Sequence, residues 1–183
     1  MVVTVTASET PRVEVSALRE AAQTLRAGDR ILLSGTVYTS RDAAHKRLFS
    51  LMAEGKPLPY PIKDGVIYYS GATPAPAGMP IGSCGPTTSG RMDVYAPKLY
   101  DMGLCATIGK GERTPEVAEA IVRNGGIYLC AVGGAGALAA KSVVSCEVIA
   151  FEDLGCEAVK RLELRDFPLI VAIDCHGGNL FQR

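Results

Sequence analysis

Three short segments of the sequence share one construction. In each, a strand-like run ends, small or hydroxyl-bearing residues follow, and a cation stands near the expected start of a helix. Arg41 lies in GTVYTSRDAAH, Arg91 in CGPTTSGRMD, and Lys110 in ATIGKGERTPE between two glycines, while Thr87 and Thr88 directly precede the second helix. Arginine binds a carboxylate through two parallel hydrogen bonds, whereas lysine contributes a point charge. Two arginines, one lysine and two threonine hydroxyls would together suit a small di-anion.

The positions of these cations conflict with the local preference of a helix. A helix start presents free N–H groups and the positive end of the helix dipole, so it attracts anions and disfavours a cation by roughly 0.3–1 kcal/mol. Such conflicts are expected where a site is built. In a parallel α/β sheet, the strand-to-helix junctions meet at the carboxyl edge, where ligands bind. Each cation taken singly is explained as a solvated surface residue, but the threefold recurrence favours one shared anion site.

Alternating strand-like and helix-like segments must position these residues. Apolar spacing predicts helices over residues 16–27, 41–54, 89–102, 115–124 and 135–141, and Thr39 or Ser40 is expected to cap the second of them. Strands are expected over residues 2–6, 30–38, 66–69, 104–108, 127–132, 144–150, 157–164 and 169–174. Residues 56–87 are rich in proline and glycine, which predicts an irregular segment around one short strand.

This alternation indicates an α/β domain with a largely parallel central sheet. The strand-rich end adds a mixed sheet or a partial barrel. Since no linker, repeat or low-complexity run interrupts the sequence, residues 1–183 are expected to form one domain.

Composition narrows the classes of function. Lys+Arg and Asp+Glu are both 19, and no basic stripe is visible, so a nucleic-acid partner is not expected. The longest apolar runs are only strand-sized, and the N-terminus lacks the pattern of a signal peptide, so we expect a cytoplasmic protein without a membrane partner. The six cysteines never form a CxxC pair, which predicts free thiols in a reducing compartment and no metal site built from this chain alone.

Other features have a second explanation. The run GAGALA after a strand fits a loose dinucleotide pattern, but we prefer to explain it as a tight turn with close helix–sheet packing. A nucleotide-binding or small-anion-binding module without catalysis remains an alternative. His45, four residues after Arg41, could line the anion site, hold Arg41 or be a buried helix histidine. His176 is expected in a turn. Asp42 is expected to complement the helix dipole, and Asp93 to pair with Arg91 or another neighbour.

The segments GTVYTSRDAAHKRL, GPTTSGRMD and IGKG, in this order, and the ending FPLIVAIDCHGGNLF resemble the C-terminal domain, or separate β subunit, of class I iron–sulfur fumarate hydratases. The resemblance covers nearly the whole chain. The β subunit of L-tartrate dehydratase shares most of these segments and is the competing assignment.

The resemblance implies a hydro-lyase that interconverts fumarate and L-malate, a reaction of the tricarboxylic acid cycle. It implies that Arg41, Arg91 and Lys110 bind the substrate carboxylates. Thr87 would bind at the reacting carbon and serve as the catalytic base, and Thr88 would support the turn by capping the helix. Specificity for fumarate, tartrate or mesaconate stays open.

The resemblance also implies what the chain lacks. A 4Fe-4S cluster would be held by a partner α subunit and not ligated by this chain, which would be active only with that subunit, as a homodimer or hetero-oligomer. The implied fold is a swivelling β/β/α domain with a mixed central sheet and flanking helices.

Overall fold

A computed structural model describes residues 10–131 and 136–182 of the chain. Its strands are β1 (Arg12–Glu14), β2 (Arg30–Thr39), β3 (Val66–Tyr68), β4 (Ala106–Gly109), β5 (Ile127–Cys130), β6 (Val143–Ala150) and β7 (Val159–Ile173). Its α-helices are α1 (Leu18–Ala22), α2 (Asp42–Ala53), α3 (Ala96–Asp101), α4 (Pro115–Arg123) and α5 (Gly136–Lys141), and the 3-10 helices are η1 (Val15–Ala17), η2 (Ser89–Met92) and η3 (Glu152–Glu157).

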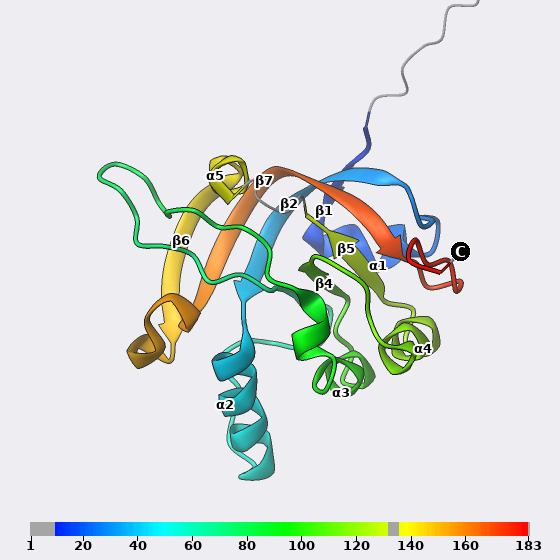
Figure 1. The fold of residues 1–183 in the computed structure, drawn as a ribbon, viewed down its shortest axis with the longest axis horizontal. Coiled ribbons are helices and arrows are strands. Elements are labelled where there is room, and N and C mark those ends of the chain that lie inside the picture. The colour runs from blue at the N-terminus through cyan, green and yellow to red at the C-terminus, as the bar shows by residue number, and fades with distance from the viewer. Residues whose placement is uncertain (1–9, 132–135, 183) are drawn as a thin grey trace, which may run out of the picture.

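The seven strands form one mixed sheet that closes on itself. β2, β3, β4 and β5 pair in parallel, one after another. β7 is antiparallel to both β5 and β2, so it completes a five-stranded ring. β1 joins the free side of β2, and β6 joins β7. Figure 1 shows α2, α3 and α4 on one side of this ring and α5 on the opposite side. The expected mixed sheet with flanking helices is confirmed.

Successive side chains of the central strands point alternately into two separate hydrophobic cores. Val66 and Tyr68 of β3 point into a cluster that includes residues of α1, α5 and β7, whereas Ile67 points into a second cluster beneath α2, α3 and α4. β3 and β4 are buried at every position because both faces are covered. This explains why these strands read as continuous apolar runs and not as alternating ones.

Several predicted elements differ from the structure. The helix predicted over 89–102 is two pieces, η2 and α3, because Pro97 stands in the first turn of α3, where a missing N–H is tolerated, and cannot continue a helix from before it. The helix predicted over 16–27 is reduced to η1 and α1. The strands predicted over 157–164 and 169–174 are one strand, β7, because β2 pairs with it along nearly its whole length, from Arg30 to Tyr38. The strand predicted over 2–6 lies outside the described residues.

None of the helices in the described ranges combines the length and apolar character required to cross a bilayer.

The parallel pairing brings three strand ends to one edge of the sheet. β2 ends at Thr39, β3 at Tyr68 and β4 at Gly109, and the registers Thr39 to Tyr68 and Tyr68 to Ile108 align these ends. Arg41 and Lys110 follow the first and third ends directly, and the loop after β3 leads to Thr87 and Arg91. The three cation-bearing segments therefore start from a common edge.

Gly35 lies where β2 shifts register against β7, and its φ of +115° is one that other residues rarely adopt. A side chain there would also lie 3.1 Å from Val15 Cβ. We expect Gly35→Ala to lower the free energy of unfolding, measured in urea, by about 1–3 kcal/mol. Gly90→Ala is the matched control, since its nearest neighbour is 3.8 Å away and its φ is not positive. Equal losses in both variants would contradict this explanation.

Candidate anion-binding site

Backbone hydrogen bonds join the second and third cation-bearing segments. The Lys110 N–H donates to the Thr87 carbonyl at 3.3 Å, and the Ser89 N–H donates to the Lys110 carbonyl at 2.9 Å. Thr88 and Lys110 thereby form a short parallel bridge that extends the pairing beyond β4. Thr87 is half-buried, and its own N–H donates to the Tyr69 carbonyl at 2.6 Å. Thr87 and Lys110 are therefore held side by side at the sheet edge.

A side-chain ion pair joins the first and second segments. Arg91 binds Asp42 through both nitrogens of its fork, with Nε 3.0 Å from Oδ1 and Nη2 2.5 Å from Oδ2. Asp42 directly follows Arg41 in the sequence. Arg91 is thus tied to the first turn of α2, next to Arg41. Asp42 was expected only to complement the helix dipole, and this expectation is incomplete because Asp42 also binds Arg91.

Arg41 has fewer side-chain hydrogen bonds than Arg91. It precedes α2 with an extended backbone, and its Nε is buried without a hydrogen-bond partner among the described residues. The carboxylate of Glu157 stands 3.9 Å from this Nε, which is too far for a hydrogen bond. The guanidinium lies against Gly71, where any Cβ would collide with it. The Arg41 Nε is therefore a donor that none of the described residues uses.

The expected side-chain caps are wrong. Arg41 itself occupies the N-cap position of α2, and no side-chain cap bond is made there. Ser40 Oγ lies 3.0 Å from His45 Nδ1, and Thr39 Oγ1 accepts the N–H of Lys160 at 3.0 Å, so both hydroxyls have other partners. Thr88 makes no cap bond to η2, because its backbone is engaged with Lys110 and its side chain is exposed.

His45 is hydrogen-bonded to the backbone of Arg41. Its Nδ1 lies 2.9 Å from the Arg41 carbonyl, which can only accept, so Nδ1 carries the proton of the neutral ring. The ring stacks on Tyr95 with centroids 5.4 Å apart and is fully buried. Burial lowers the pKa of His45 to about 4, so the ring is neutral near pH 7.

A buried ion pair lies behind the exposed cations and was not identified from the sequence. Arg113 Nε is 2.6 Å from Asp93 Oδ1, with side chains 0% and 4% exposed. Arg113 also donates to Thr107 Oγ1 at 3.0 Å and lies over the Tyr128 ring at 4.7 Å. Asp93 lies two residues after Arg91, and Arg113 three after Lys110, so the pair fixes both segments together. The open expectation for Asp93 is thereby settled in favour of Arg113 rather than Arg91.

The remaining sequence candidates have local explanations. His176 lies in a turn as expected, where its N–H donates to Asp174 Oδ1 at 2.8 Å. Backbone N–H groups of Ala27, His176 and Gly178 lower the pKa of Asp174 despite its partial desolvation. The GAGALA segment lies partly outside the described residues, and its described part begins α5.

Cysteine positions do not suggest a metal centre within residues 10–131 and 136–182, where no group of three or more His, Cys, Asp or Glu side chains could hold an ion. Burial raises the pKa of the Cys84 and Cys105 thiols to about 11, so both are protonated near neutral pH.

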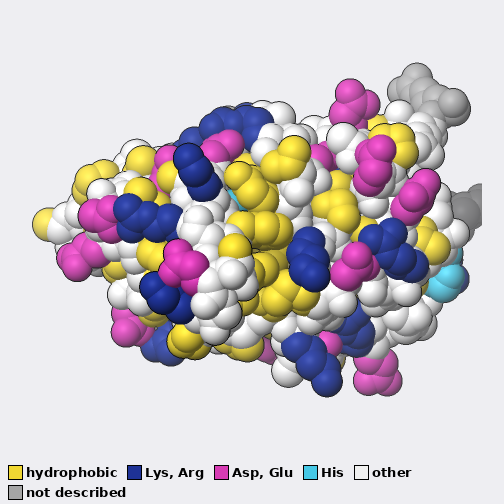
Figure 2. All heavy atoms as spheres, turned by 90° about the horizontal axis from the view of Figure 1, so that it is seen from below, with side chains coloured by type: hydrophobic (Ala, Val, Ile, Leu, Met, Phe, Trp, Pro, Cys, Tyr) yellow, Lys and Arg dark blue, Asp and Glu magenta, His cyan; other side chains and the backbone are white. Residues whose placement is uncertain are grey.

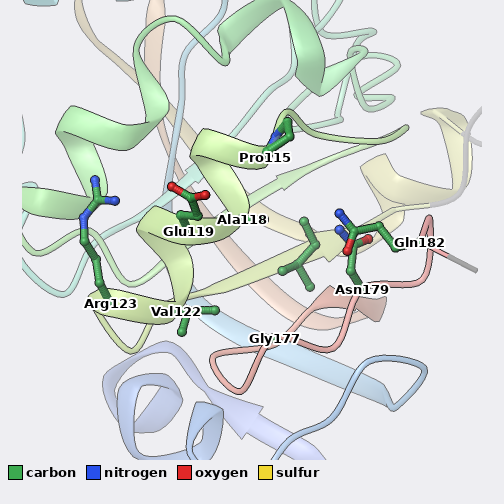
Figure 3. Close-up of a pocket in the computed structure, with 9 residues that line it drawn as sticks. Pro115, Ala118, Glu119, Val122, Arg123, Gly177, Asn179 and Gln182 are labelled. Carbon is green, nitrogen blue, oxygen red and sulfur yellow. The ribbon is translucent and has the colours of Figure 1, made fainter.

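Charged side chains of both signs and a separate pocket lie elsewhere on the surface. Figure 2 shows Lys and Arg interspersed with Asp and Glu around apolar side chains on the face beneath α2 and α3. A pocket of about 370 Å³ lies between α4 and the C-terminal segment. Figure 3 shows the residues that line it. Its lining includes Glu119, Val122 and Asn179 but not Arg41, Arg91 or Lys110. The pocket is therefore a different feature from the site described above.

The stability cost of breaking the buried Asp93–Arg113 pair can be tested. Removing one charge leaves the other buried and unpaired, so Asp93→Asn should lower the free energy of unfolding by about 3–5 kcal/mol in urea melts. Asp101→Asn is the control, because Asp101 and Arg123 form a similar pair that is 43% and 48% exposed. Its loss should stay below about 1 kcal/mol. A control loss as large as that of Asp93→Asn would show that burial is not the cause.

The two histidines provide a pH test. Between pH 6.5 and 4 the unfolded chain protonates position 45 and the folded chain does not, so stability is lost as the pH falls through this window. We expect wild type to lose up to about 3 kcal/mol more than His45→Gln over this range, measured by urea unfolding at several pH values. His176→Gln, which removes the exposed histidine, is the control variant. An unchanged slope in His45→Gln would contradict a buried neutral His45.

Comparison with known proteins relates the whole chain to one family. The family model described as Fumarase C-terminus matches residues 2–183. The chain is 43% identical over 156 residues to the anaerobic class I fumarate hydratase of Escherichia coli K12, and 39% identical over 158 residues to fumarate hydratase 2 of Leishmania major. These matches cover 84% and 85% of the chain but only 28% of each relative.

A second group of relatives is matched over most of its own length. The chain is 36% identical over 164 residues to the putative L(+)-tartrate dehydratase subunit beta of Methanocaldococcus jannaschii, covering 86% of the chain and 84% of the relative. It is 34% identical to the L(+)-tartrate dehydratase subunit beta of E. coli K12, covering 88% and 81%. By the family match and these identities, the chain belongs to the Fumarase C-terminus family.

Proposed function

We propose that this chain supplies the carboxylate-binding half of a hydro-lyase site that interconverts fumarate and L-malate. The proposal depends on one observation: the three cation-bearing segments are connected at one edge of the sheet. The side chains of Arg91 and Asp42 form an ion pair, and the backbones of Thr88 and Lys110 form a parallel bridge. The names and identities of the fumarate hydratase relatives support the reaction. The fold to which we assign the ring and its helices is the swivelling β/β/α domain.

The chemistry of the reaction matches the charges of this site. Removing water from malate takes a weakly acidic proton from the carbon beside a carboxylate and expels hydroxide from the next carbon. Loss of the proton builds negative charge on that carboxylate, and fixed cations stabilise such charge in the transition state. Arg41, with unused donors, would bind one carboxylate through its fork, while Arg91 and Lys110 supply further positive charge.

Thr87 is our proposed catalytic residue at the reacting carbon. The Thr87 N–H donates to the Tyr69 carbonyl, and the Thr87 carbonyl accepts from the Lys110 N–H. These two hydrogen bonds fix the Thr87 backbone next to Lys110. A threonine hydroxyl is a weak base unaided, and a neighbouring positive charge would favour its deprotonation. Thr88 is assigned to substrate binding, and His45 to holding the Arg41 backbone.

Departure of hydroxide requires a Lewis acid or a general acid. The described residues contain no group of three or more His, Cys, Asp or Glu side chains that could hold a metal. Three of the cysteines, Cys84, Cys105 and Cys175, are buried, and a 4Fe-4S cluster does not fit them. We assign such a cluster to a partner α subunit, which would supply the Lewis acid. The active assembly would then be a hetero-oligomer.

L(+)-tartrate dehydration is the second candidate. It is favoured by one specific finding: the tartrate dehydratase β subunits are matched over 84% and 81% of their own length. Fumarate, tartrate and mesaconate differ in substituents next to the same carboxylates, so the cation-bearing segments suit all three. The choice between them depends on turnover measurements.

The test is anaerobic co-expression with a cluster-bearing α subunit, followed by turnover assays with fumarate, L-malate, L-tartrate and mesaconate. We expect turnover by the pair and none by this chain alone. Arg41→Lys should lower kcat/KM about 10- to 100-fold, since one charge-assisted hydrogen bond contributes about 1.5–3 kcal/mol. Arg123→Lys, in an exposed pair with Asp101, is the matched control and should remain near wild type.

Two results would contradict the proposal. Hydration of fumarate by this chain alone would exclude a shared site. Tight NAD binding by the chain, without dicarboxylate turnover by the pair, would favour the nucleotide-binding alternative.

A further inference from the structure

Glu157 stands beside Arg41 although it lies at the far end of the chain. We propose that Glu157 is a positioning residue that holds the Arg41 guanidinium in place for the substrate carboxylate. The inference rests on the proposed function, because it gives Arg41 a ligand. No part of it requires Glu157 to touch the substrate.

The contact is part of a wider docking of η3 onto α2. Arg47 Nη1 donates to Asp153 Oδ1 at 2.7 Å, and the Ala43 N–H donates to Glu157 Oε1 at 3.3 Å. The same Glu157 oxygen is 3.9 Å from Arg41 Nε. Glu157 therefore lies at the N-terminus of α2, where the helix dipole favours a carboxylate. It offsets there the unfavourable charge of Arg41.

Burial distinguishes the two arginine pairs. The side chains of Arg41 and Glu157 are 23% and 25% exposed, whereas those of Arg47 and Asp153 are 42% and 64% exposed. Charges interact more strongly where water is partly excluded. The Arg41–Glu157 pair is accordingly the one whose removal should alter the position of a guanidinium.

The length of the contact allows Arg41 to act on a ligand. Asp42 binds Arg91 at Nε and Nη2, so one edge of that guanidinium is already used. Glu157 instead approaches Arg41 beyond hydrogen-bond range, and Arg41 Nε has no partner among the described residues. A carboxylate at this distance attracts and orients the guanidinium without consuming its donors.

Glu157 is itself held from both sides. Lys160 Nζ donates to the carbonyls of Cys156 at 3.1 Å and Ala158 at 3.3 Å, the residues on either side of Glu157. The Lys160 N–H donates to Thr39 Oγ1, at the end of the strand that leads to Arg41. The end of η3 and the start of α2 are thereby fixed to one another through the backbone of β7.

The experiment uses the reconstituted pair and a double-mutant cycle. Glu157→Gln, which keeps the shape and removes the charge, should lower kcat/KM for the dicarboxylate about tenfold. The loss should appear mainly in KM, because Arg41 binds the carboxylate in the ground and transition states alike. In an Arg41→Ala background, Glu157→Gln should have less than a twofold effect, since it acts through Arg41.

Asp153→Asn is the matched control, because it removes the other η3 carboxylate that binds an arginine of α2. It should leave kcat/KM within twofold of wild type. Melting temperatures of both variants should agree, which separates positioning from loss of structure. Glu157→Asp, which keeps the charge, should recover part of the activity even if Glu157→Gln is less stable.

The outcomes separate this inference from the proposed function. If the wild-type pair turns over no dicarboxylate, or if Arg41→Ala is as active as wild type, the proposed function fails and the inference fails with it. If turnover depends on Arg41 but Glu157→Gln behaves like Asp153→Asn, only the inference is overturned. An equal effect of Glu157→Gln with and without Arg41 would also overturn it.

Discussion

The pairing of β7 with two strands at once is the constraint on which the rest of the structure depends. Its antiparallel bonds to β2 and β5 close the ring and fix the order of the parallel strands between them. Because β2, β3 and β4 are neighbours in that ring, their carboxyl ends must share an edge. The site follows from this arrangement, since each cation-bearing segment leaves the sheet at, or is reached from, one of those ends.

The three arginines in and behind the site differ in burial and in how their guanidinium groups are paired. Arg113 is withdrawn from water and neutralised by Asp93, so it serves structure alone. Arg91 is half-exposed and bound by Asp42, so it contributes charge but holds its fork against α2. Arg41 has a distant carboxylate and an unsatisfied Nε. This gradation supports our proposal that Arg41 recognises the ligand more directly than the other two arginines do.

The sequence predicted the elements better than their connections. Apolar spacing placed α2, α4 and β2 within about two residues, because each depends on a local repeat and nearby stop signals. Pro97 could have warned that residues 89–102 would not form one helix. The continuity of β7 could not be predicted locally, since it depends on pairing with β2, more than a hundred residues earlier.

For the site too, the local sequence predicted positions but not long-range partners. The shared edge for Arg41, Arg91 and Lys110 was predicted because parallel strands align their ends. The carboxylate partners were not predicted: Asp42 lies 49 residues before Arg91, and Asp93 lies 20 before Arg113. Nothing in the local sequence distinguishes these carboxylates from solvated ones, because each acquires its partner only through the folded sheet.

Closing the ring also limits how the described strands could pair with another molecule. Among the strands of residues 10–131 and 136–182, only β1 and β6 have an unpaired side, and an unpaired strand side is a template for aggregation. β1 has only three residues. β6 is longer and exposes Val144 and Val148, but it shifts register against β7 near both of its ends and carries the charged Glu147 between those valines. Bulges and an outward charge discourage intermolecular strand addition, so β6 can display apolar side chains without becoming the start of a fibril.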